Sequence, residues 1–129
     1  MKALEAWHEF ILSGDPRKLH ALLEPDAVFE SPVVHTPQHG RDLAMRYLLG
    51  AVSVLGNENF RYVGAWTNAT GAVLEFVTEL DGVTVNGVDI MRFTEDGERI
   101  ANFKVMVRPI KAIDVLRSRM AALLAASAA

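Results

Sequence analysis

The residues whose types and spacing most plainly suggest chemistry lie in FESPVVHTPQHG, residues 29–40. His35 and His39 follow Ser31 in a stretch that also holds two prolines and a glycine. Imidazole changes protonation near neutral pH, so either histidine is a candidate catalytic acid or base if the segment folds over a pocket. The alternative is an exposed loop whose histidines have no catalytic role. The spacing alone leaves both interpretations open.

The same two histidines also have the spacing of a helical metal-binding pair. Pro37 between them disfavours a regular helix, and no carboxylate motif completes the three or four ligands that a metal site needs. The sequence has no cysteine, which excludes thiolate ligands, disulfides and a cysteine nucleophile. It also lacks a glycine-rich phosphate-binding motif. We therefore predict no metal and no cofactor.

Hydrophobic periodicity predicts the elements that must position these residues. It indicates two N-terminal helices divided at SGDP, a strand at DAVFES, a helix at GRDLAMRYLLGAVSVLG and a closing helix after Pro109. Four strand-like segments lie between residues 59 and 107, divided by NATG and by two Asp-Gly pairs, which are typical of hairpin turns. The sequence therefore predicts an α+β fold with an antiparallel meander.

The Asp-Gly pairs also predict a register for the meander. If each pair forms a two-residue turn, Asp89 lies opposite Leu74 on one neighbouring strand and opposite Lys104 on the other. Directly opposite residues share a sheet face. One predicted face then carries Leu74, Phe76, Asp89, Met91, Phe93, Ile100, Asn102, Lys104 and Met106. The other carries Val73, Val77, Val88, Ile90, Phe103, Val105 and Val107, with Glu75, Asn86 and Arg92 among them.

This register leaves two interpretations of Asp89. It forms an ion pair with Lys104 at a solvated sheet edge, or it lies in a cavity where apolar neighbours shift its pKa. The residues predicted to line such a cavity are Trp7, Tyr47, Phe76, Met91 and Met106, although these spacings are also typical of an ordinary core. Asp89, Asn102 and Lys104 would then orient a ligand.

Composition restricts the class of protein. The 129 residues fit one domain, and a net charge of −3 with scattered basic residues gives no surface for a nucleic-acid backbone. No stretch has the length of a membrane span, and the N-terminus lacks the apolar run of a signal peptide. We expect a cytoplasmic protein that binds neither nucleic acid nor membrane. A hydrophobic content of 50% suggests a pocket, a partner, or both.

The order of these phrases resembles the nuclear transport factor 2-like superfamily, which includes ketosteroid isomerase and the SnoaL-like polyketide cyclases. WHEFILSGDPRKLHALLEPDAVFESPV is similar to the superfamily's opening helices and strand, and VDIMRFTEDGERIANFKVMVRP is similar to its penultimate hairpin. The resemblance covers nearly the whole chain. It implies one SnoaL-like domain over residues 1–129, with a cone-shaped curved antiparallel sheet wrapped by N-terminal helices and followed by a C-terminal helix.

The resemblance also assigns positions in the pocket. In ketosteroid isomerase, a tyrosine and a protonated aspartic acid form the oxyanion hole, and a second aspartate moves the proton. These positions correspond here to Trp7, Asp89 and Ser31 respectively. An indole cannot replace a phenol as an acid, and an unassisted serine is no base near neutral pH. The loop histidines, His35 and His39, are the remaining candidates for a base.

We therefore expect a small, largely apolar molecule to bind in a conical pocket, with isomerase, cyclase, dehydratase or hydrolase chemistry centred on Asp89. The alternative is a non-catalytic ligand-binding or assembly module of the same fold, which the residues at the tyrosine and base positions favour. Because the helices can cover only one sheet face, we expect a homodimer through the other. This predicted interface is formed by Val88, Ile90, Phe103 and Val105.

Overall fold

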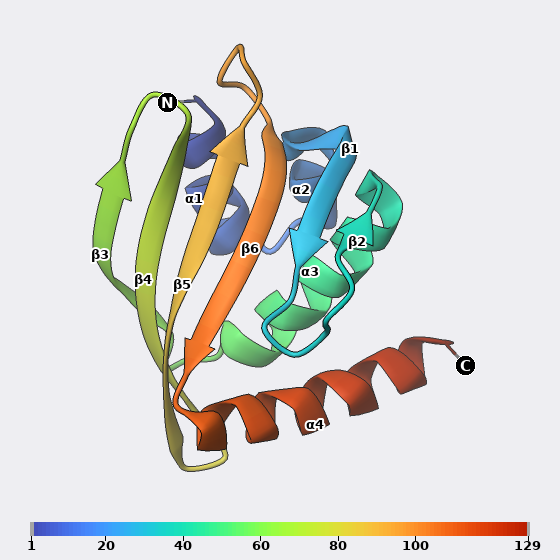
Figure 1. The fold of residues 1–129 in the computed structure, drawn as a ribbon, viewed down its shortest axis with the longest axis vertical. Coiled ribbons are helices and arrows are strands. Elements are labelled where there is room, and N and C mark those ends of the chain that lie inside the picture. Colours follow the sequence, from blue (N-terminus) through green and yellow to red (C-terminus); the bar gives the residue numbers. More distant parts are fainter. Residues whose placement is uncertain (1, 129) are drawn as a thin grey trace.

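In the computed structural model, which describes residues 2–128, helices and strands follow the predicted order with one short strand added (Figure 1). The helices are α1 (Lys2–Ser13), α2 (Pro16–Leu22), α3 (Arg41–Leu55) and α4 (Ile110–Ala128). The strands are β1 (Leu23–Glu30), β2 (Gln38–His39), β3 (Arg61–Thr67), β4 (Gly71–Leu80), β5 (Val83–Phe93) and β6 (Ile100–Arg108). The added strand β2 includes one of the two histidines of the predicted loop.

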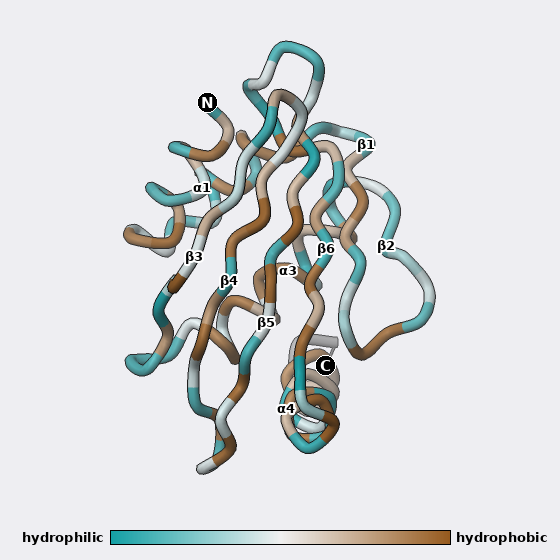
Figure 2. Tube along the Cα trace, turned by 60° about the vertical axis from the view of Figure 1, so that its left-hand side comes forward, coloured by the Kyte–Doolittle hydropathy of each residue, from teal (hydrophilic) through white to brown (hydrophobic). Residues whose placement is uncertain are grey.

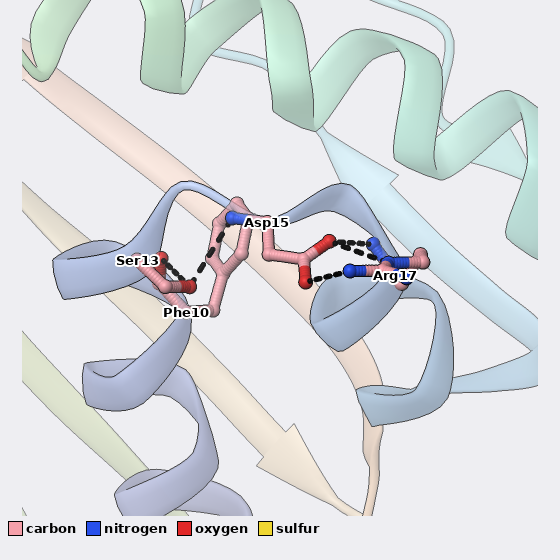
Figure 3. A network of polar contacts seen from close by, with 4 residues as sticks. All are labelled: Phe10, Ser13, Asp15 and Arg17. Atoms are coloured by element: carbon pink, nitrogen blue, oxygen red, sulfur yellow. Dashed lines mark hydrogen bonds and ion pairs between the residues drawn. The ribbon is translucent and has the colours of Figure 1, made fainter.

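Local hydrogen bonds end α1 and begin α2 at the junction between the two helices (Figure 3). Gly14 has a φ of 66°, which glycine adopts without strain, and its N–H donates to the carbonyl of Phe10 at 2.7 Å. Asp15 then caps α2, because its carboxylate accepts from the backbone N–H of Arg17 at 3.0 Å. Hydrogen bonds from the side chain and backbone of Arg17 also lower the pKa of Asp15.

The sheet has the strand order β2-β1-β6-β5-β4-β3. Strand β1 runs parallel to β6, while every other neighbouring pair is antiparallel. Figure 1 shows α1, α2 and α3 behind one face of this curved sheet, with α4 crossing below it. This arrangement confirms the predicted α+β fold class, with one parallel pairing within the otherwise antiparallel sheet.

The core lies between the helices and the sheet face that they cover. Its largest fully buried side chains include Trp7 and Phe10 from α1, Phe29 from β1, and Phe76 and Phe103 from the meander. Trp7 contacts Phe103, with ring centroids 4.7 Å apart. Along β5 and β6, hydrophobic and hydrophilic stretches alternate in Figure 2, as expected for strands with one covered face. The first helix is therefore packed directly against the centre of the sheet.

The two predicted hairpins differ in outcome. The β4–β5 register is confirmed, with Leu80 opposite Val83 and Leu74 opposite Asp89. The predicted β5–β6 register is wrong beyond the first pair, because the sheet has a bulge next to Phe93. The turn itself does not shift the pairing, since the N–H of Thr94 donates to the carbonyl of Arg99 at 2.8 Å and Phe93 lies opposite Ile100, as predicted. The extra residue is Ala101, which has no partner between Ile100 and Asn102.

The bulge reverses the predicted faces of β6. Asp89 lies opposite Val105 instead of Lys104, since a one-residue slip turns each side chain to the other face. Phe103 and Val105 therefore point into the core, with exposures of 1% and 4%. The predicted pocket residues Asn102, Lys104 and Met106 lie on the face that the helices leave uncovered, and Met106 is 51% exposed.

A matched pair of alanine variants tests this register. Phe103→Ala removes a fully buried ring and is expected to lower the free energy of unfolding by about 3–5 kcal/mol. Asn102→Ala changes an outward-facing residue, and its free energy of unfolding is expected to differ from that of the wild type by less than about 0.5 kcal/mol. Urea unfolding of both variants gives the two values. Equal losses, or a larger loss for Asn102→Ala, would contradict the observed register.

Candidate functional site

A cavity of about 250 Å³ lies between the covered sheet face and helices α1 and α3. Most of its wall is apolar, and the connection between α3 and β3 forms part of it. The lining residues are Trp7, Ile11, Leu48, Ala51, Val52, Leu55, Gly56, Asn57, Phe60, Tyr62, Phe76, Asp89, Phe103 and Val105. This composition is typical of a small-molecule site, in which a few polar groups orient an otherwise apolar ligand.

Three of the four polar side chains that line the cavity are joined by two hydrogen bonds. The indole Nε1 of Trp7 donates to the hydroxyl oxygen of Tyr62 at 3.0 Å. The Tyr62 hydroxyl donates to Oδ2 of Asp89 at 2.6 Å, a length typical of a hydrogen bond to a charged acceptor. Three separate elements, α1, β3 and β5, thus supply one connected network.

The sheet register explains how Tyr62 reaches Asp89. Tyr62 lies opposite Phe76 and Asp89 lies opposite Leu74, so the two polar residues flank β4 on its covered face. A bulge at Val63 is required for this arrangement, because the residues on either side of it are out of regular register. The hydroxyl of Tyr62 crosses over β4 to the carboxyl group.

Burial changes the acidity of both groups. Asp89 is only 6% exposed, and the loss of solvation raises its pKa to about 7, although the hydrogen bond from Tyr62 acts in the opposite direction. The pKa of Tyr62 is raised above its usual range, first by burial and then by the negative charge of Asp89. Near neutral pH the carboxyl group is therefore divided between its acidic and ionised forms, while the phenol stays protonated.

The raised pKa of Asp89 predicts a particular dependence of stability on pH. Its pKa is about 7 in the fold, above the usual aspartate value of 3.8, so the folded chain binds the proton more tightly than the unfolded chain. Stability from this group is present at low pH and is lost as the pH rises toward 7. Between about pH 5 and pH 8, the free energy of unfolding of the wild type should fall by roughly 3 kcal/mol relative to that of Asp89→Asn.

Urea unfolding of both proteins at the two pH values measures this difference. Asp96→Asn is a suitable control, because a hydrogen bond from Thr94 lowers the pKa of Asp96 and keeps it ionised over this range. Parallel pH profiles for the wild type and Asp89→Asn would show that the carboxyl group is not protonated in the fold.

The predicted site residues fall into two groups. Trp7, Phe76 and Asp89 line the cavity as expected. Met91 is buried in the core and Tyr47 is partly buried against it, but neither lines the cavity. Asn102, Lys104 and Met106 are excluded from the cavity by the register described above.

Ser31 and His35 also lie away from the cavity. They line a separate groove between the 31–35 segment and β6, together with Lys104 and Met106. The hydroxyl of Ser31 accepts a hydrogen bond from the backbone N–H of Val33 at 3.1 Å. Both loop histidines are exposed, and His39 belongs to the edge strand β2. The structure thus brings no histidine into contact with Asp89.

Lys104 has a different ionic partner from the one predicted. Its Nζ lies 3.6 Å from Oε2 of Glu30 on the parallel strand β1, and both side chains are partly exposed. Of the two interpretations of Asp89, the ion pair with Lys104 is therefore wrong, and within residues 2–128 no positively charged side chain is paired with Asp89. Over residues 2–128, no cluster of three or more His, Asp or Glu side chains could hold a metal ion.

Tyr62 is the polar residue of the hydrogen-bond network that sequence reasoning missed. Regular pairing back from the NATG turn would place Tyr62 opposite Val77 and direct its hydroxyl away from the cavity. The bulge at Val63 shifts the pairing by one residue and turns Tyr62 inward. The signal that was available is the phenol itself, since a tyrosine within a strand next to a predicted pocket can supply a hydrogen bond.

A curved sheet covered by helices, with one buried carboxyl group in an apolar cavity, defines a small α+β protein with a small-molecule pocket. The family model for the SnoaL-like domain matches residues 4–103, so the chain belongs to the SnoaL-like family. This membership confirms the resemblance to the nuclear transport factor 2-like superfamily.

Solved structures show the same fold. A protein from Pseudomonas aeruginosa named steroid delta-isomerase shares 35% identity, with 97% of this chain and 90% of that chain covered at a TM-score of 0.89. A cystatin-like-fold protein from Silicibacter pomeroyi DSS-3 shares 30% identity over 98% of this chain and 87% of that chain, with a TM-score of 0.88.

A protein from Shewanella denitrificans OS-217 assigned as a SnoaL-like polyketide cyclase is similar in fold alone. It shares 14% identity over 90% of this chain and 95% of that chain, with a TM-score of 0.66. A comparison with curated proteins found no match. Among the described residues, none of the helices has both the length and the apolar character needed to cross a membrane.

Proposed function

We propose that this protein binds a small, largely apolar molecule in the cavity and that Asp89 acts on an oxygen atom of that molecule. The observation that carries the proposal is the carboxyl group of Asp89, 6% exposed within an apolar wall and hydrogen-bonded to Tyr62. Such a group is costly to bury, so its position in a cavity favours a functional role. The similarity to a protein named steroid delta-isomerase supports isomerase chemistry.

The neutral carboxyl group is the form suited to this chemistry. It donates a hydrogen bond or a proton to a ketone, an epoxide or a leaving hydroxyl group, which stabilises negative charge developing on that oxygen. Such a step is shared by ketone isomerisation, epoxide hydrolysis and the dehydration of alcohols. The low polarity of the cavity strengthens the interaction, because solvent competes weakly for the donor.

A non-catalytic ligand-binding module is the second candidate, and one observation favours it. The titratable groups among the lining residues are Asp89 and Tyr62, and Tyr62 is engaged with Asp89. Ser31, at the position of the base in ketosteroid isomerase, lies outside the cavity. Abstraction of a proton from carbon would therefore depend on Asp89 itself or on water.

Exchange of the α-hydrogens of indanone in heavy water separates the two candidates. Binding and accelerated exchange are both expected for the wild type, while Asp89→Asn should abolish the acceleration. Asp89→Ala removes the hydrogen bond to the ketone oxygen and should weaken binding by about 10–100-fold. NMR measures both quantities, with Glu75→Gln on the uncovered sheet face as the control. Binding without exchange would favour the non-catalytic module.

We also propose that two copies associate through the uncovered sheet face. Val88 and Ile90 lie there as predicted, whereas Phe103 and Val105 were assigned to this face wrongly and belong to the core. Trp66 and Met106, which are 59% and 51% exposed, extend the apolar surface. An exposed apolar sheet face of this kind favours a symmetric partner.

Light scattering after size-exclusion chromatography tests the dimer. The wild type should elute with twice the mass of one chain, and Ile90→Lys should elute as a monomer, because it buries a charge in the interface. Leu12→Lys is the matched control, since Leu12 is 89% exposed on α1 and away from this face. A monomeric wild type at micromolar concentration would contradict the proposal.

A further inference from the structure

The hydrogen bonds around the cavity decide which polar atom a ligand meets. The lining side chains that carry polar atoms are Trp7, Asn57, Tyr62 and Asp89. The amide of Asn57 is engaged at the rim, where Nδ2 donates to the carbonyl of Glu79 at 2.9 Å and Oδ1 accepts from the hydroxyl of Thr78 at 3.0 Å. Asn57 thus holds the connection between α3 and β3, and its Oδ1, which also accepts from the backbone N–H of Asn59 at 2.8 Å, is not offered to a ligand.

The chemistry of Trp7 fixes which groups donate and which accept in the hydrogen-bond network of Trp7, Tyr62 and Asp89. An indole N–H can only donate, so the hydroxyl oxygen of Tyr62 is the acceptor of the 3.0 Å hydrogen bond. A phenol oxygen has one hydrogen and one main accepting direction near the plane of its ring. Since Trp7 occupies the accepting direction, the hydrogen of Tyr62 is directed to Oδ2 of Asp89. The N–H of Trp7 and the hydroxyl of Tyr62 are therefore both engaged in hydrogen bonds within this network.

The second carboxyl oxygen of Asp89, Oδ1, differs from Oδ2 in its hydrogen bonding. Oδ1 has no hydrogen-bond partner within residues 2–128. In this part of the chain, Nε of Arg41 is the only completely buried side-chain nitrogen or oxygen atom that lacks a partner. Oδ1 is therefore not completely buried, and Asp89 is a lining residue of the cavity.

We infer that Trp7 is a positioning residue, whose N–H fixes the direction of the Tyr62 hydrogen bond so that Oδ1 is the carboxyl oxygen of Asp89 offered to the ligand. This inference deepens the proposed function and rests on it for the ligand class. The ligand is an apolar molecule with one hydrogen-bond-accepting oxygen, such as a ketone or an epoxide, that receives the proton on Oδ1. A polar group elsewhere on the molecule would meet apolar wall.

Loss of the Trp7 N–H would change this arrangement in two ways. The oxygen of Tyr62 could accept a hydrogen bond from neutral Asp89 through Oδ2, which would turn the phenol hydrogen into the cavity. Tyr62 would also be a weaker donor to ionised Asp89, because the chain would lose the cooperative strengthening that Trp7 provides. Both changes favour the neutral carboxyl group, so Asp89 should release its proton at a higher pH.

The groups facing Asp89 make this pH dependence interpretable. Tyr62 on β3 is its titratable neighbour, and the exposed ring of His8 on α1 contacts Tyr62 with centroids 5.8 Å apart. The facing residues on β4 and β6, Leu74 and Val105, are apolar, as are the lining residues of α3. His8→Gln therefore serves as a control for a charge that acts through Tyr62.

The first experiment uses the ligand-free protein. NMR of isotope-labelled aspartate carboxyl carbons follows the titration of Asp89, with Asp89→Asn to assign the signal. Trp7 is replaced by benzothienylalanine, which keeps the shape of tryptophan without the N–H, in a Trp66→Phe background. The midpoint should rise by a few tenths of a pH unit, and by about one to two units in Tyr62→Phe. An unchanged midpoint in the Trp7 analogue would overturn the positioning role.

The second experiment tests the ligand class by titrating indanone and hydroxyindane, which share a ring skeleton. The ketone oxygen of indanone can only accept a hydrogen bond, so only the neutral carboxyl group of Asp89 binds it. Its Kd should therefore rise about tenfold per pH unit above the titration midpoint of Asp89. The phenol of hydroxyindane can also donate, so its Kd should change less. Equal pH profiles would overturn the ligand class. If neither probe binds while the NMR midpoint shifts, the proposed function fails and the role of Trp7 stands.

Discussion

The short hydrogen bond from Tyr62 to Asp89 is the interaction on which the interior depends. Asp89 is 6% exposed, and within the described part of the chain no positive charge is paired with it to offset its loss of solvation, since Lys104 pairs with Glu30 on the other side of the sheet. The Tyr62 hydroxyl provides its hydrogen bond, and the Trp7 indole orients that hydroxyl. The first helix, the edge strand β3 and the central strand β5 must therefore keep their relative positions for the carboxyl group to be accommodated.

Two bulges give these strands their functional faces. The bulge at Val63 turns Tyr62 inward, and the irregularity next to Phe93 turns Phe103 and Val105 inward in place of Lys104. Each inserts a single residue, and each changes the face of all side chains beyond it. Without the first, the carboxyl group would lack its donor. Without the second, a lysine would lie beside it and favour the ionised form.

The site differs from that of ketosteroid isomerase in how its donors are arranged. There, a tyrosine and a protonated aspartic acid both donate to the substrate oxygen. By the correspondence that the resemblance implies, Trp7 takes the place of the tyrosine, and here the phenol of Tyr62 donates to Asp89. The cavity holds one carboxyl group, that of Asp89, while Ser31, which the same correspondence assigns to the second aspartate, lies outside the cavity. Chemistry in this pocket would depend on the single group Asp89.

The sequence by itself determined the order of the helices and strands, the β4–β5 hairpin and the presence of Asp89 on an apolar sheet face. These features follow from local periodicity, from turn residues and from a tight two-residue turn at Asp81 and Gly82. Only the tertiary structure decided that Tyr62 meets Asp89 and Trp7 meets Tyr62, that Lys104 does not meet Asp89, and that His35 and His39 remain at the surface. The physical reason is that a bulge inserts only one residue into a strand but moves every later side chain of that strand to the opposite sheet face. The sequence carries little local signal for such an insertion.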